Sequence, residues 1–152
     1  MCIRDRFHST LNSLKGLLAF EAATGGETEV SAARRRGEEY LLERQLLNRL
    51  TTNQPVGQWV NDFSYPMRWS YSALNAAEYF RRAVLHDGTA PDSRMSAAVE
   101  IVRAARQPDG TWLQTGRQPG RMWFEVDVPA GQPSKWLTLY GTRLLNWWDC
   151  AA

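Results

Sequence analysis

The chain has 152 residues, of which 43% are hydrophobic and 22% charged, and its formal net charge is +2. This composition is typical of one folded domain and excludes a disordered chain, and the small charge argues against nucleic acid as a partner. No apolar run reaches the roughly 18 residues of a membrane span and no signal peptide is apparent, so a cytoplasmic protein without a membrane span is expected.

Two amphipathic helices are predicted in the first third of the chain. Leucines at positions 11, 14, 17 and 18 have helical spacing and predict a helix over 9–22, which Thr24–Gly26 ends. A second helix is predicted over 28–48. It contains the triplet Arg34–Arg36, with glutamates three and four positions away. We interpret this triplet as a solvent-exposed helix face with i,i+3 and i,i+4 ion pairs, not as a nucleic-acid patch.

Long loops alternate with helices in the rest of the chain. Residues 51–69 combine prolines and aromatic side chains without a helical period. Helices are predicted over 70–86, from a cap at Asp92 or Ser93 to Gln107, and over 136–148. The loop 107–135 is rich in proline and glycine, and the alternation of Phe124, Val126 and Val128 predicts one short strand. The predicted fold class is therefore all-α, with helix pairs, two long loops and little or no strand.

The helix pairs repeat along the sequence. Residues 39–41, Glu-Tyr-Leu, align with residues 100–102, Glu-Ile-Val, at a shift of 61 positions. The first helices of the two pairs align at a shift of 63, through a Leu-Asn dipeptide. We predict a single domain over 7–152 with repeats at 7–68, 69–135 and 136–152. Each helix pair needs neighbouring pairs to bury its apolar face.

Two segments resemble the two halves of a known repeat motif. "RGEEYLLERQ" resembles the first half of the QW motif of squalene–hopene cyclases, and "QPDGTW" resembles the second half. Each copy departs from the motif in its other half. The matching positions are Arg36, Gly37, Tyr40, Leu41 and Gln45 in the first segment, and Gln107, Gly110 and Trp112 in the second.

The resemblance implies the α/α toroid of terpenoid cyclases and protein prenyltransferases, in which inner and outer helices alternate around an apolar cavity. We interpret the motif residues as scaffold. An amide such as Gln107 can donate to the free carbonyls at a helix end, Gly110 can adopt positive φ, and Trp112 can cover the next repeat.

The first six residues, "MCIRDR", resemble a translated sequencing-adapter scar, so we expect residues 1–6 and with them Cys2 to be non-native. Cys2 and Cys150 predict no disulfide framework. Two and a half repeats make only a partial ring, so we expect a C-terminal fragment whose upstream repeats are missing. Its open, apolar edges favour self-association.

The chemistry that the resemblance implies is incomplete in this chain. Cyclases of this family begin catalysis with an Asp-x-Asp-Asp motif, which is absent here. Weak catalytic candidates are the carboxylates of Glu125 and Asp127, which would point the same way on a strand, and His8. The histidines and cysteines lack the spacing of zinc ligands, and no phosphate-binding loop is present, so no metal and no cofactor are predicted.

Candidate substrate-binding residues come from the starts of the inner helices and from the two long loops, which we expect to meet at one rim. Aromatic side chains there can hold a prenyl chain or stabilise a carbocation, or they can simply pack between repeats. The candidates are Arg68, Trp69, Tyr71, Trp123, Lys135 and Trp136, with Phe63 and Tyr65 in the first loop.

Three functions remain open at this point. The first is a fragment of a squalene-cyclase-like isomerase that binds or cyclises an isoprenoid or another apolar small molecule. The second is a non-catalytic α/α-toroid scaffold for binding or interaction. The third is a carbohydrate-active α/α toroid, in which aromatic rings stack on sugars and paired carboxylates act.

Overall fold

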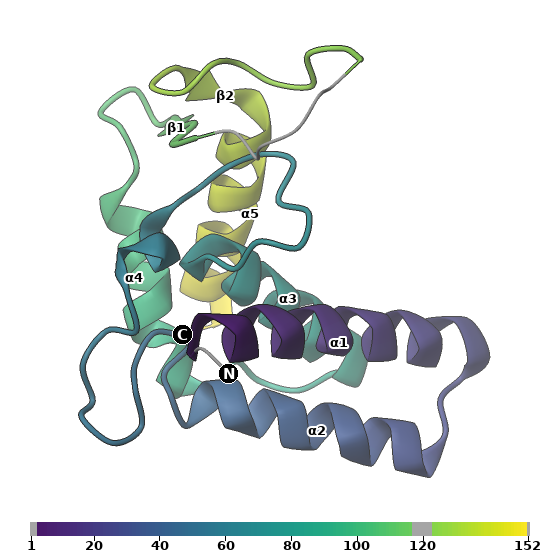
Figure 1. Cartoon of the computed structure of the whole chain (residues 1–152). Helices are drawn as coiled ribbons and strands as arrows, with labels where there is room; N and C mark the ends of the chain where they lie inside the picture. Colours follow the sequence, from purple (N-terminus) through teal and green to yellow (C-terminus); the bar gives the residue numbers. More distant parts are fainter. Residues whose placement is uncertain (1–2, 117–122, 152) are drawn as a thin grey trace.

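A computed structural model describes residues 3–116 and 123–151, and in this part of the chain the fold is all-α, as predicted (Figure 1). The α-helices are α1 (Ile3–Thr24), α2 (Thr28–Leu42), α3 (Ala73–Asp87), α4 (Ser96–Ala104) and α5 (Lys135–Ala151), with 3₁₀ turns at Gln58–Asn61 and Ser93–Met95. Two short strands, β1 (Trp112–Leu113) and β2 (Pro133–Ser134), pair antiparallel.

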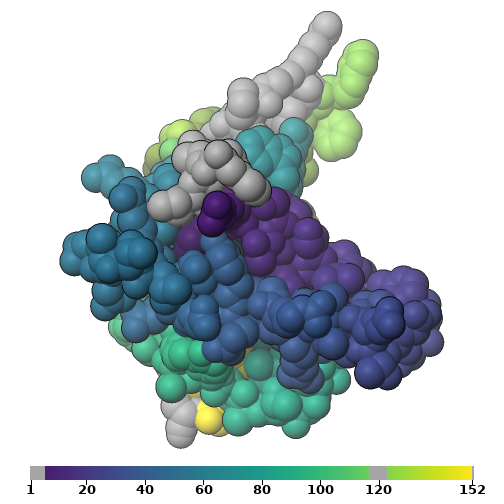
Figure 2. Space-filling view, turned by 60° about the horizontal axis from the view of Figure 1, so that its bottom comes forward, coloured from purple at the N-terminus to yellow at the C-terminus, as the bar shows by residue number. Residues whose placement is uncertain are grey.

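The helices form two layers. In the first layer α3 lies in the middle and contacts α1 on one side and α5 on the other. In the second layer α2 covers α1, and α4 covers α3 and α5. Arg94, just before α4, forms an ion pair with Glu39 of α2 at 2.6 Å, so the covering helices lie on the same side. The turn that joins α1 to α2 projects from one side of the molecule (Figure 2).

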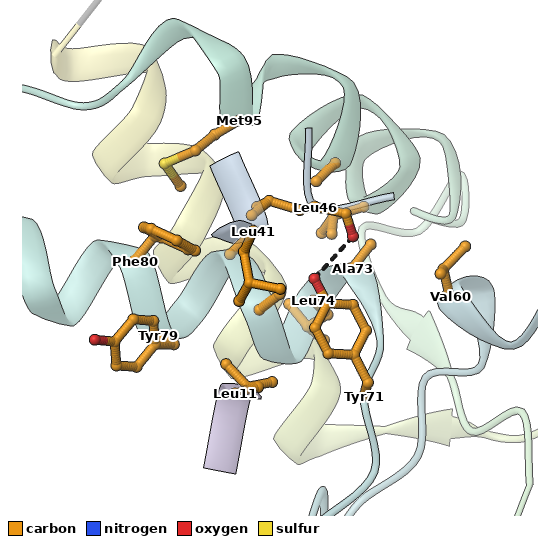
Figure 3. Packing of buried hydrophobic residues seen from close by; sticks show 14 of the residues in the cluster. Leu11, Leu41, Leu46, Val60, Tyr71, Ala73, Leu74, Tyr79, Phe80 and Met95 are labelled. Atoms are coloured by element: carbon orange, nitrogen blue, oxygen red, sulfur yellow. Dashed lines mark hydrogen bonds between the residues drawn. The ribbon is translucent and has the colours of Figure 1, made fainter. Parts of the chain in front are cut away.

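The core lies between the layers. Every residue from Tyr71 to Phe80 is buried, which marks α3 as the central helix. Leucines of α1 and α2, Met95 and Trp112 join the same cluster. The hydroxyl of Tyr71 donates a 2.8 Å hydrogen bond to the carbonyl of Leu46 (Figure 3). This bond satisfies two buried polar groups and ties the end of the first helix pair to the start of the second.

Two predicted helix boundaries were wrong by six residues, and the others differ from the structure by three residues or fewer. The first helix begins at Ile3 and not at residue 9, because the buried ring of Phe7 continues the apolar stripe and packs edge-on against Tyr71, with 5.2 Å between ring centroids. The second helix ends at Leu42 and not at residue 48. Gln45 and Leu46 take positive φ values of 49° and 62°, which turn the chain so that Leu46 is buried in the core.

The turn signals around α3 and α4 were right. Gly88 ends α3 with φ of 64°, and the carboxylate of Asp92 accepts a 2.9 Å hydrogen bond from the N–H of Arg94 at the start of the next helical segment. The strand predicted at Phe124, Val126 and Val128 is absent. Phe124 is 74% exposed, so this alternation has no buried face that would stabilise a strand.

The predicted exposure of the arginine triplet was wrong for Arg34. Its side chain is 1% exposed and forms ion pairs with Glu21 of α1 at 2.8 Å, Glu38 at 2.6 Å and Asp87 of α3 at 2.7 Å. Arg35 and Arg36 are exposed, as predicted. Burial alone lowers the pKa of Arg34, but the hydrogen bonds to Glu21 and Asp87 and the charge of Glu38 together raise it above its ordinary value, so the guanidinium stays charged. One buried cation thus joins three helices through three carboxylates.

Acidification is expected to destabilise the fold in part through this network. The hydrogen bond from Arg34 lowers the pKa of Glu21 below its ordinary value of 4.5. A lowered pKa in the folded state adds stability that is complete above the ordinary value and is lost as the pH falls through the folded value. Urea unfolding at a series of pH values checks this, and we expect a steeper loss below about pH 5 for the wild type than for Glu21→Gln.

The comparison with Glu21→Gln is needed because other carboxylates also make the free energy of unfolding depend on pH. Hydrogen bonds from Arg94 also lower the pKa of Glu39 and of Asp92. These ion pairs are unchanged in the variant. Their contribution therefore cancels when the pH dependence of the unfolding free energy is compared between the wild type and Glu21→Gln. Identical slopes for the wild type and Glu21→Gln would contradict the prediction.

Candidate functional site

A pocket of about 440 Å³ opens on the face of the α1–α3–α5 layer that α2 and α4 leave uncovered. Helices from the three predicted repeats and the first long loop contribute to it. Its lining residues are Lys15 of α1, Asn75, Glu78, Tyr79, Arg81 and Arg82 of α3, Tyr140 and Arg143 of α5, and Tyr65, Met67 and Arg68 of the loop.

The charge of the lining is strongly positive, with five basic side chains and a single carboxylate, that of Glu78. Glu78 accepts hydrogen bonds from Nε and Nη2 of Arg81 at 2.9 and 3.0 Å, and also from the guanidinium of Arg143 on α5. Glu78 therefore holds two guanidinium groups at the pocket wall and links α3 to α5.

Lys15 of α1 lies across the pocket from Arg143 of α5, because α1 and α5 flank α3. Its ammonium donates a 2.6 Å hydrogen bond to Oδ1 of Asn75, which connects α1 to α3. Burial lowers the pKa of Lys15, and the positive charge of Arg82 lowers it further. Within residues 3–116 and 123–151 neither Lys15 nor Arg82 has an ion pair with a carboxylate. This wall therefore carries positive charge that the described residues do not neutralise.

Aromatic rings form the third wall. Tyr65 stacks on Trp136 with 5.0 Å between ring centroids and lies 6.2 Å from the ring of Tyr140. The backbone of Tyr65 is held by buried Gln114, whose amide oxygen accepts from its N–H and whose amide nitrogen donates to its carbonyl, both at 2.9 Å. The N–H of Thr115 donates to the carbonyl of Phe63, so the two long loops do meet at one rim.

Most of the predicted substrate-binding residues lie outside this pocket. Arg68 lines it, and Trp136 supports its aromatic wall through Tyr65. Trp69 and Tyr71 form a separate aromatic group with His8 and Trp59, in which the ring of His8 lies 5.4 Å from Trp59 and 5.7 Å from Trp69. His8 is buried among these rings and does not line the pocket.

The predicted carboxylate pair also lies elsewhere. Glu125, Asp127 and Lys135 border a shallow depression of about 290 Å³, and Trp123 is 90% exposed. Asp127 accepts a hydrogen bond from the hydroxyl of Ser134, whose oxygen accepts in turn from the N–H of Leu137. Asp127 therefore supports the start of α5. Because the segment is not a strand, the sequence argument that its two carboxylates point the same way does not hold.

The residues that match the second half of the QW motif make scaffold contacts. The amide of Gln107 donates a 3.1 Å hydrogen bond to the carbonyl of Ala105 at the end of α4, and Gly110 has φ of 86°. Trp112 is fully buried, and its indole N–H donates to the carbonyl of Val102 at 2.8 Å. Its ring lies against Gly141 of α5, the next helix in the chain.

The residues that match the first half also make scaffold contacts. A Cβ atom on Gly37 would lie 2.8 Å from the side chain of Leu14, so this glycine lets α2 approach α1 closely. Tyr40 packs against Phe7, and Gln45 accepts a hydrogen bond from Asn48. Leu41 is fully buried, whereas Arg36 is exposed.

One group in the described part of the chain, Glu21, His86 and Asp87, has carboxylate and imidazole atoms within 4.8 Å of one another. The guanidinium of Arg34 donates to both carboxylates, so a cation already satisfies them. We therefore assign this group to the ion-pair network and not to a metal centre. Cys150 is an exposed free thiol, and Cys2 lies outside the described residues.

The sequence reasoning missed the polar lining of the pocket, although a signal was present. Asn75, Glu78 and Arg82 follow one another at spacings of three and four, which place them on one face of a helix whose first half is apolar elsewhere. Polar residues on such a face indicate a hydrated surface inside the fold. Lys15 and Arg143 carry no comparable local signal, because only the packing of α1 and α5 on α3 brings them to the pocket.

No helix in the described part of the chain combines the length and the hydropathy that a membrane crossing requires. Comparison of the sequence with protein-family models finds no match, and comparisons with curated proteins and with solved structures find none either.

Proposed function

We propose that this chain is part of an α/α-toroid protein similar to the squalene–hopene cyclases, and that it binds a small molecule of the isoprenoid class in the pocket of the α1–α3–α5 layer. The observation that carries the proposal is the position of this pocket. It lies on the first helix of each successive pair, and these are the helices that would face the centre of a toroid.

The lining supports binding of a partly apolar molecule. Tyr65, Tyr79, Tyr140 and Met67 contribute aromatic and thioether surface, and the Tyr65–Trp136 stack fixes the orientation of one wall. A volume of about 440 Å³ lies in the range of small-molecule sites. The other lining side chains are polar or charged, and such groups can orient a ligand whose organic part lies against the rings.

The role proposed for these residues is binding and not initiation of a cyclisation. The pocket's carboxylate, Glu78, accepts hydrogen bonds on both oxygens from the guanidinium groups of Arg81 and Arg143, so it is engaged in holding these side chains. An isomerase would therefore need its acid from another part of the protein.

Isothermal titration calorimetry with geraniol, a neutral isoprenoid alcohol, tests the proposal. We expect saturable binding that weakens several-fold in Tyr140→Ala, because the variant removes one aromatic face of the pocket. Trp69→Ala is the matched control, since it removes an exposed ring that does not line the pocket. No binding of geraniol, or the same loss in both variants, would contradict the proposal, and tighter binding of a neutral oligosaccharide would favour the carbohydrate-active alternative.

A further inference from the structure

We propose that the pocket of the α1–α3–α5 layer binds a multivalent oxyanion, a phosphate or diphosphate group, as the charged part of its ligand. The inference deepens the proposed function by naming the chemistry of one end of the ligand at the same site. It stands on the charge and the geometry of the lining and does not depend on the ligand being an isoprenoid.

The distribution of charge is the first argument. Five basic side chains and one carboxylate line the pocket, an excess of four positive charges, while the formal net charge of the whole chain is only +2. The rest of the protein is therefore net negative, and the positive charge is concentrated in one concave site. Such a site attracts anions, and the size of its excess suits a group with several negative charges better than one carboxylate.

The arrangement of the guanidinium groups is the second argument. Glu78 accepts from both Arg81 and Arg143, so these long side chains are held in place before a ligand arrives. The planar donors of arginine match the oxygens of phosphate, and preorganised donors lose less entropy on binding.

The third argument is the positive charge of Lys15 and Arg82, which no described carboxylate pairs with. Lys15 and Arg82 face the same pocket, and the charge of Arg82 contributes to the lowered pKa of Lys15. Two cations that repel each other beside a partly buried site destabilise the empty pocket. An oxyanion between them would replace this repulsion by attraction, so the site is electrostatically complementary to such a group.

The size of the site indicates that the anion is part of a larger molecule. A volume of about 440 Å³ exceeds what a phosphate or diphosphate group fills, and the adjoining wall consists of the rings of Tyr65 and Tyr140. The cationic and aromatic surfaces therefore divide the pocket into an anion-binding part and a part that can hold an organic group.

Titration of the intact chain with inorganic pyrophosphate tests the inference. We expect saturable binding by calorimetry at low ionic strength that weakens several-fold when salt screens the pocket. Arg82→Gln and Lys15→Gln should each weaken binding about tenfold, the effect of losing one charge-assisted contact. Arg82 is exposed, so its variant should keep the fold, and glutamine at position 15 retains a hydrogen-bond donor near Asn75.

Arg49→Gln is the matched control, because Arg49 is an exposed arginine that precedes the first loop and does not line this pocket. Binding that both pocket variants weaken and the control preserves supports the inference. No saturable binding of pyrophosphate by the wild type, or an equal loss in Arg49→Gln, overturns it. Geraniol separates the two proposals, since binding of pyrophosphate without geraniol refutes only the isoprenoid class, and binding of geraniol without pyrophosphate refutes only the oxyanion.

Discussion

Replacement of Arg34 by methionine is expected to lower the free energy of unfolding by about 3–5 kcal/mol, because removal of one partner from a buried ion pair leaves uncompensated charge. Arg34 is 1% exposed and donates to the carboxylates of Glu21, Glu38 and Asp87. Without it, these three carboxylates repel one another in a site with little water. Urea unfolding at neutral pH measures the loss.

The control for this prediction is Arg35→Met on the neighbouring position of the same helix. The side chain of Arg35 is 56% exposed, and among the described residues its ion pair is with Asp87, at 3.2 Å. Exposed pairs contribute about 0–1 kcal/mol, so a small effect is expected. Acidification should also narrow the difference in unfolding free energy between Arg34→Met and the wild type, because protonation of Glu21 removes the stability that its hydrogen bond with Arg34 gives the wild type. Equal losses in the two variants would contradict a special role for the buried arginine.

Substitutions at Trp112 and Gly141 are expected to have strongly coupled effects on the free energy of unfolding. Trp112→Ala should cost about 3–5 kcal/mol, as for other buried tryptophans. Gly141→Ala should cost about 1–3 kcal/mol in the wild type through overpacking. A Cβ atom at position 141 would lie 2.7, 2.8 and 2.9 Å from three atoms of the indole of Trp112, and a rigid ring held by its hydrogen bond to Val102 cannot move aside cheaply.

A double-mutant cycle measures this coupling. In the Trp112→Ala background the methyl group of Ala at position 141 enters space that the indole has left, so we expect Gly141→Ala to cost nothing there or to stabilise the helix slightly. Gly16→Ala is the reference for the intrinsic helix effect. Gly16 is an exposed position of α1 where a Cβ atom would meet only open space, and alanine there should stabilise by about 0.5–1 kcal/mol. Additive costs in the cycle would rule out the proposed contact.

The boundary errors show where local patterns stop being sufficient. Helical spacing of apolar residues predicted the course of α2, yet the helix ends at Leu42 because burial of Leu46 in the core requires a left-handed turn. The alternation at residues 124–128 had the period of a strand, but no element covers one of its faces. In both places tertiary packing decided between conformations that the local sequence permits.

The sequence by itself determined the features whose interactions span a few residues. These are the all-α class, the end of α3, the cap before α4, and the turn that carries Gln107, Gly110 and Trp112, because caps and tight turns depend on neighbouring positions. The tertiary structure alone decided the buried state of Arg34 and the cationic pocket. Arg34 meets Asp87 across 53 positions, and Glu78 meets Arg143 across 65. Charge and burial at such sites depend on which helices pack together, and no local period encodes that.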